Sequence, residues 1–135
     1  MLLLLLSLGM TACVPSREEA DRKLSAACEA SVTVTFTDPK DHMDVQKAFY
    51  SFEKGADGAK LRVVTLKARY TYNDSAPEDK TYLCTYAEEW SLFGYLPEFY
   101  NLQRDELKYG NFDGVITGDT NTLIKINEAT QKALN

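Results

Sequence analysis

The one histidine of the chain, His42, is the side chain best suited to proton transfer near neutral pH. Asp38, Asp41 and Asp44 lie close to it in the sequence. A single histidine among acids, just after Pro39, is typical of a solvated loop, and no nucleophile-elbow, zinc-helix or phosphate-loop motif accompanies it. A pair of catalytic carboxylates that meet only in space stays open. We therefore expect no enzyme activity, no metal site and no cofactor, and we rank binding above catalysis.

An apolar run at the start of the chain ends in a cysteine. Residues 2–6 are all leucine, and the run leads to Met10, Thr11, Ala12 and Cys13. It is too short to span a bilayer but suits the core of an export signal. These last four residues resemble the lipobox of bacterial lipoproteins, in which the cysteine is lipidated and becomes the mature N-terminus.

The lipobox resemblance implies a location as well as an anchor. Residues 1–12 would be the signal peptide, and residues 13–16 the lipidated N-terminus and a short tether. In such lipoproteins an Asp after the cysteine tends to retain the protein at the inner membrane, whereas Val14 stands there. The resemblance thus implies the outer membrane, with the domain facing the periplasm. An ordinary secretory signal, with Cys13 incidental, is the alternative.

With Cys13 assigned to lipid, two cysteines remain, Cys28 and Cys84. In an oxidising envelope compartment, an even remainder favours one disulfide. A link across a loop of this length stabilises a domain by roughly 4 kcal/mol. Two free thiols in a redox or metal site are the alternative, but the chain has no Cys-x-x-Cys motif.

Composition is that of an ordinary globular chain, with 26% charged residues and no internal repeat. Its length without the signal suits one domain, or one small domain with a helical appendage. The formal net charge of −5 argues against nucleic acid and against anionic lipid headgroups as partners. The membrane contact should therefore be the acyl chains alone.

A capping box opens the first expected helix, with the hydroxyl of Ser16 followed three residues later by Glu19. Apolar residues then recur at three- and four-residue spacing and include Cys28, which should face the core. Nothing breaks the pattern before Pro39, so we expect the helix to reach about Phe36.

Alternation of apolar and polar residues predicts strands over residues 61–72 and 81–86. In the second strand, Cys84 shares the aromatic face, which would carry it inward to Cys28. Residues 45–52 fit either a helix or a strand, and we favour a strand. In the first strand, the expected buried face comprises Val64, Leu66, Ala68, Tyr70 and Tyr72. The expected solvent face comprises Val63, Thr65, Lys67, Arg69 and Thr71.

Residues 86–112 hold more than half of the aromatic residues of the chain, interleaved with acids. Such a mixture is typical of a surface that binds a basic protein or a sugar. The alternative is that the rings close the open side of the core under an irregular loop. The candidate partner-binding residues are Glu88, Glu89, Trp90, Phe93, Tyr95, Phe99 and Tyr100.

The end of the chain, residues 95–135, resembles the small three-helix peptidoglycan-binding module around Asp113, Gly114, Thr120 and Ile124. The resemblance implies a turn at the Asp-Gly pair, a helix cap at the threonine and an isoleucine packed inside. The alternative is an amphipathic C-terminal helix capped at Thr120 or the residue before it.

Together these patterns predict an α+β fold. An N-terminal helix packs on a small antiparallel sheet and is linked to it by the disulfide, within residues 17–90. Residues 91–135 add an aromatic loop region and a C-terminal helix to the same domain.

The expected function is that of a non-enzymatic envelope lipoprotein, which binds an envelope protein as a structural or adaptor component. Two alternatives remain. One is an inhibitory lipoprotein, such as an immunity protein, an inhibitor of a wall-degrading enzyme or a phage superinfection-exclusion protein. The other is a peptidoglycan-binding lipoprotein.

Overall fold

The computed structural model describes residues 14–135; the expected signal peptide and Cys13 lie outside the described residues. No helix in the described part is long and apolar enough to cross a membrane. The α+β fold is confirmed. The elements are, in chain order, α1 (Arg17–Phe36), β1 (His42–Lys54), β2 (Lys60–Thr71), β3 (Glu78–Ser91), β4 (Gly94–Arg104), β5 (Leu107–Phe112), β6 (Val115–Thr117) and α2 (Thr120–Leu134).

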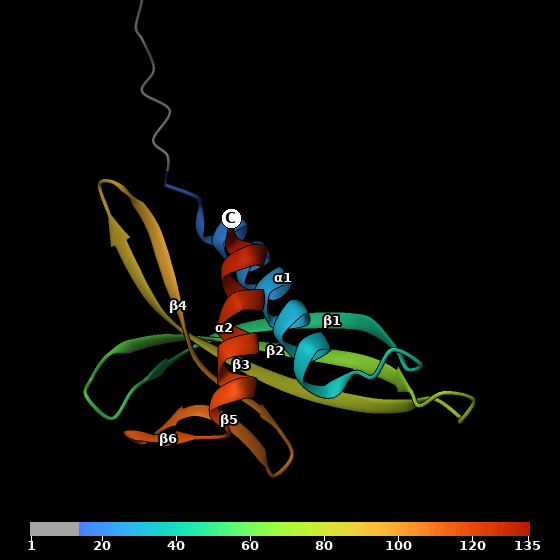
Figure 1. Ribbon diagram of the computed structural model, residues 1–135. Coiled ribbons are helices and arrows are strands. Elements are labelled where there is room, and N and C mark those ends of the chain that lie inside the picture. The colour runs from blue at the N-terminus through green and yellow to red at the C-terminus, as the bar shows by residue number, and fades with distance from the viewer. Residues whose placement is uncertain (1–13) are drawn as a thin grey trace, which may run out of the picture.

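The six strands form one sheet in which each strand pairs antiparallel with the next along the chain. The two helices pack against each other and lie across one face of this sheet, as Figure 1 shows. Within residues 14–135, the other face carries no helix. An antiparallel sheet tolerates such one-sided cover, because its strands alternate between a buried and a solvated face.

Helix α1 begins where the capping box predicts. The hydroxyl of Ser16 accepts a hydrogen bond from the Glu19 amide at 3.2 Å. The helix ends at Phe36, because Thr37 is extended and Pro39 follows closely. Its inward face packs on the sheet through a stripe of fully buried residues: Leu24, Ala27, Cys28 and Val32.

The core lies between the helices and the two central strands. As predicted, β2 and β3 direct alternate residues into it: Val64, Leu66, Ala68, Tyr70, Tyr82, Cys84 and Tyr86. The expectation for Tyr72 was wrong, since β2 ends one residue earlier and this ring is exposed. The strand favoured for residues 45–52 is confirmed as part of β1.

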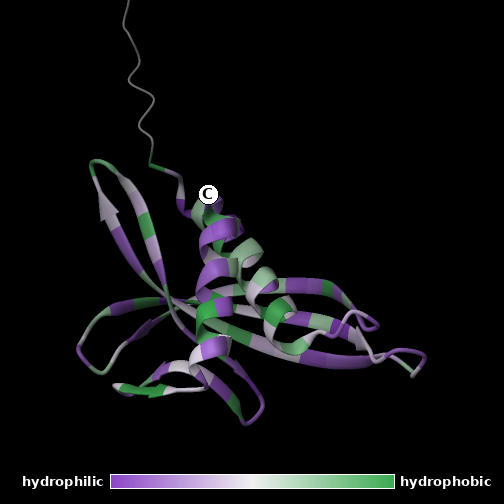
Figure 2. Cartoon of the chain, viewed as in Figure 1, coloured by the Kyte–Doolittle hydropathy of each residue, from purple (hydrophilic) through white to green (hydrophobic). Residues whose placement is uncertain are grey.

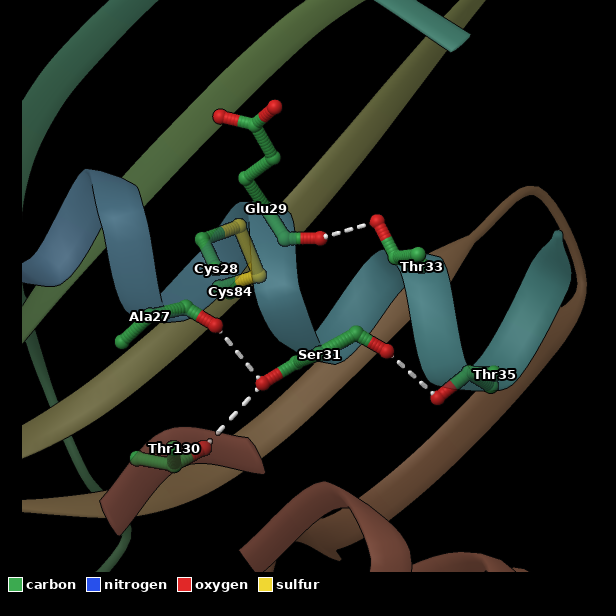
Figure 3. Close-up of a disulfide and its surroundings, with 8 residues drawn as sticks. All are labelled: Ala27, Cys28, Glu29, Ser31, Thr33, Thr35, Cys84 and Thr130. Carbon is green, nitrogen blue, oxygen red and sulfur yellow. Dashed lines mark hydrogen bonds between the residues drawn. A yellow bond between two sulfur atoms is a disulfide. The ribbon is translucent and has the colours of Figure 1, made fainter. Parts of the chain in front are cut away.

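The disulfide between Cys28 and Cys84 is present, with the sulfur atoms 2.02 Å and the Cα atoms 5.7 Å apart. It joins α1 to the central strand β3 (Figure 3). Beside it, the hydroxyl of Ser31 donates to the Ala27 carbonyl at 2.8 Å and lies 3.1 Å from the hydroxyl of Thr130 on α2. One side of α1 is therefore fixed to the sheet covalently, and another to α2 by buried hydroxyls.

The aromatic region is not an irregular loop, so that expectation was wrong. Strand β3 continues to Ser91, the chain turns over Leu92 and Phe93, and β4 returns from Gly94. The resulting hairpin extends past the rest of the sheet (Figure 1). Cross-strand pairing over residues 86–99 satisfies backbone groups that a loop would leave open.

The C-terminal third also differs from the expected three-helix arrangement. Residues 94–117 are mostly strands, and α2 is the one helix that follows them in the described chain. Asp113 and Gly114 do make a turn, between β5 and β6, and both have positive φ. The side chain of Asp119 caps α2 by accepting from the Thr122 amide at 3.0 Å. Ile124, expected inside, is half exposed.

Candidate functional site

The seven predicted partner-binding residues all lie on the β3–β4 hairpin, but the structure divides them between separate environments. Glu88, Trp90 and Tyr95 form a cluster on the hairpin just before its tip, and Glu89 is exposed beside it. The others lie apart: Phe93 at the tip, Phe99 against the core and Tyr100 along the opposite face of the sheet.

This part of the hairpin is held by an ion pair with the start of α1. Both terminal nitrogens of Arg17 donate to the two carboxylate oxygens of Glu88, each at 2.7 Å. The hydroxyl of Tyr95 donates to the same carboxylate. The side chain of Glu88 is only 6% exposed, so its charge is neutralised inside the protein. Within the domain, this carboxylate is therefore already paired with Arg17.

These contacts shift the ionisation of both partners of Glu88. The hydrogen bond to Glu88 raises the pKa of Arg17 above its ordinary value, which keeps the guanidinium charged. Burial raises the pKa of Tyr95, and its hydrogen bond to Glu88 raises it further. These contacts form a clamp, in which Glu88 holds Arg17 of α1 and Tyr95 of β4 together.

A second ion pair lies deeper, between Asp21 on α1 and Arg62 on β2. Two nitrogens of Arg62 donate to the two oxygens of Asp21 at 2.9 and 2.7 Å. Burial acts to raise the pKa of Asp21, but the hydrogen bonds from Arg62 and Arg17 outweigh it and lower the pKa below its ordinary value. Sequence reasoning missed this pair. The sequence did contain one indication of it: in the alternation of β2, Arg62 falls on the same buried face as Val64.

Aromatic rings surround these cations. The guanidinium of Arg62 lies 4.1 Å from the ring centre of Phe52, and the ammonium of Lys60 lies 4.3 Å from it. The ring centres of Trp90 and Tyr95 are 4.4 Å apart. A hollow of about 300 Å³ lies between Arg17, Phe52, Lys60, Glu88 and Trp90. Of the donors here, Arg17 already has partners within the protein, Glu88 and Asp21.

The tip of the hairpin presents apolar side chains to solvent. Leu92 is 97% exposed and Phe93 is 96% exposed. Neither contributes to the core, so the tip is free to contact something outside the domain. Of the predicted residues, Phe93 is the one whose exposure fits a binding role most directly.

The open face of the sheet contains a hollow of about 310 Å³ that sequence reasoning did not predict. Its floor includes Leu61, Val63 and Thr85, all nearly buried although no helix covers them. The turn after β1 and the turn after β5 form two of its walls, at residues 53–56 and 111–113. Val63 was expected on the solvent face but is only 5% exposed. The two turns and their neighbouring strands close around this part of the sheet and shield it.

A third surface lies between the helices on their outer side. Small and apolar residues line a groove of about 770 Å³, among them Ala26, Ala30, Val34, Ala129 and Ala133. Charged side chains flank it, including Glu29, Lys125, Glu128 and Lys132. This groove is wide and shallow compared with the hollow on the open face.

Of the acids near His42, Asp41 is hydrogen-bonded to other parts of the domain. His42 is the exposed first residue of β1. Asp41 accepts from the hydroxyl of Tyr70 at 2.5 Å and from the Asn73 amide at 3.0 Å. Burial and Asp41 raise the pKa of Tyr70 to about 12. Across residues 14–135, no three His, Cys, Asp or Glu side chains gather as metal ligands would.

Comparison with known proteins adds no relative to this description. No protein-family model, no curated protein and no solved structure matches the chain.

Proposed function

We propose that this chain is a lipid-anchored protein of the bacterial envelope that binds a protein partner, as a structural or adaptor component, without catalysing a reaction. The lipobox at Met10, Thr11, Ala12 and Cys13 supports the anchor. The observation that carries the binding role is the hollow on the open face of the sheet.

The hollow has the features of a protein-binding surface. Its lining is mainly polar: Thr65, Asn101 and Gln103 surround the nearly buried Leu61 and Val63. Glu53, Lys54 and Asp113 add charges of both signs. Hydrogen bonds and ion pairs with side chains of these kinds are part of the usual anatomy of a protein interface. The size suits one or two side chains of a partner rather than a large ligand.

The charge of the chain indicates the kind of partner. The formal net charge is −5, and Glu89 and Glu98 are exposed on the hairpin. Such a surface attracts a basic protein and speeds its association. We therefore propose a partner that presents a basic surface to the periplasm at the outer membrane.

The anchor is tested by replacing Cys13 with Ser in the full chain. We expect the variant to lose fatty-acid labelling and to leave the membrane fraction, because no other residue offers a thiol at the lipobox. Unchanged labelling in this variant would refute the anchor.

The binding surface is tested by placing an arginine in the hollow. Thr65→Arg fills it from the centre of β2, so we expect loss of the envelope proteins that co-purify with the wild-type chain. The matched control is Val34→Arg, in the groove between the helices, where the same change should leave them bound. Equal retention in both variants would contradict a binding role for the hollow.

A further inference from the structure

We propose that the tip of the β3–β4 hairpin, Leu92 and Phe93, inserts into the surface of the lipid bilayer to which the chain is anchored. The inference rests on the lipid anchor of the proposed function. It adds a second, non-covalent membrane contact and with it a fixed orientation of the domain.

The composition of the tip suits the boundary between water and acyl chains. Leu92 and Phe93 are almost fully exposed, and Trp90, 42% exposed, lies two residues before Leu92. Residues 90–97 contain no charged side chain. Figure 2 shows the tip as hydrophobic. Aromatic and aliphatic side chains without nearby charge are favoured at this boundary.

The tip lies at the end of the molecule where the anchor would be. The described chain begins at Val14, one residue after Cys13, and this start and the hairpin tip lie at the same end in Figure 1. The pair between Arg17 and Glu88 ties the first turn of α1 to the hairpin at 2.7 Å. A bilayer that holds the lipid of Cys13 would therefore lie at this end of the domain.

The hairpin is braced so that the tip projects as a unit. The rings of Trp90 and Tyr95 pack at 4.4 Å, and the hydroxyl of Tyr95 donates to Glu88. At the turn, the hydroxyl of Ser91 accepts a hydrogen bond from the Phe93 amide at 3.2 Å. A braced tip loses little conformational freedom when it enters the membrane surface.

The bilayer surface fits this tip better than a protein partner does. The flanking acids Glu89 and Glu98 stand back from the turn, so insertion would rest on apolar burial and not on headgroup charge. Exposed apolar residues also occur on the β5–β6 hairpin, at Val115 and Ile116. That hairpin lies at the opposite end of the molecule in Figure 1, where the same bilayer cannot reach it.

Trp90 is the only tryptophan in the chain and provides a probe beside the tip. The lipidated full chain is reconstituted in phosphatidylcholine vesicles with or without brominated acyl chains, and its flotation is measured. We expect the brominated lipid to quench the fluorescence of Trp90. The double variant Leu92→Ser with Phe93→Ser should still float but lose most of this quenching, while Val115→Ser with Ile116→Ser should keep it.

The outcomes separate the two proposals. A chain that floats while Trp90 stays unquenched would overturn the inserted tip and leave the anchor standing. Quenching that survives in the Leu92 and Phe93 double variant would overturn it as well. A wild-type chain that does not float would overturn the anchor and, with it, this inference. Thermal melting of each variant checks folding, which these exposed positions should not disturb.

Discussion

At the scale of single residues, the buried pair of Asp21 and Arg62 joins the helix layer to the sheet. Each side chain is about nine-tenths buried, and each satisfies the other through two hydrogen bonds. A pair of this kind adds little net stability over an apolar pair of the same shape, but it is costly to break on one side. The pair instead fixes the position of α1 relative to β2.

We predict that Asp21→Asn destabilises the domain by about 3–5 kcal/mol, because it leaves the charge of Arg62 buried without an anion. Urea unfolding measures the loss. The matched control is Glu18→Gln, which breaks the exposed pair with Arg22 and should change stability by less than about 0.5 kcal/mol. Similar effects of the two changes would contradict the assigned importance of burial.

The same pair predicts a dependence on pH. Because the pKa of Asp21 is lower in the folded than in the unfolded protein, its ionised form stabilises the fold above the unfolded pKa of about 3.9. That contribution is lost as the pH falls through the lower folded pKa. Urea unfolding at a series of pH values should show the wild type and Asp21→Asn converging below about pH 4. A constant difference across that range would contradict the coupling.

At the scale of elements, local patterns predicted those helices and strands whose periodicity is uninterrupted. The capping box at Ser16 and the alternation around Val64 and Cys84 each depend on residues close in sequence. The hairpin was missed because Pro97 lies within β4, where proline normally argues against a strand. A register shift near Tyr86 also breaks the two-residue alternation.

The candidate site could be predicted only in part, because its contacts join residues that lie far apart in the sequence. The aromatic stretch was recognised, but its division into clamp, core and tip depends on contacts between distant residues. Arg17 and Glu88 are 71 positions apart, and no local pattern indicates that they meet. The hollow on the open face was missed because shielding by remote turns, rather than alternation, buries Val63.

The hairpin predicts different costs for its two most prominent rings. Phe93→Ala should change the free energy of unfolding by less than about 0.5 kcal/mol, because the ring is almost fully exposed. Trp90→Ala should cost about 1 kcal/mol, since it removes the packing on Tyr95 and the contact with Arg17. Denaturant unfolding of both variants measures these two changes in the free energy of unfolding. A loss of 3–5 kcal/mol in Phe93→Ala, as for a buried ring, would show that the tip belongs to the core.

At the scale of the whole molecule, three surfaces with different chemistry lie on different sides. The hairpin tip is apolar and lies at the end where the described chain begins, whereas the hollow lies on the open face of the sheet and the groove on the outer side of the helices. A domain held at its hairpin end would leave the hollow accessible from the periplasm. The proposed anchor and the proposed partner would therefore not compete for the same surface.

This arrangement depends on the helix layer staying fixed to the sheet, which the disulfide enforces. The bond closes a loop of 56 positions that contains β1 and β2, so its loss frees a large part of the unfolded chain. We predict that Cys28→Ala with Cys84→Ala lowers the free energy of unfolding by roughly 4 kcal/mol. Denaturant unfolding measures the difference.

Reduction of the disulfide in the wild type should also destabilise the domain and lower its melting temperature. The double variant, which has no disulfide, is the control, and the reductant should leave its melting temperature unchanged. Substitution and reduction remove the same bond by different means. A loss of stability caused by the alanine side chains, and not by loss of the bond, would appear in the double variant but not in the reduced wild type. If the wild type melts at the same temperature with and without reductant while both thiols become alkylatable, the bond contributes no stability. The packing of α1 and α2 on the sheet would then suffice to hold the two layers together.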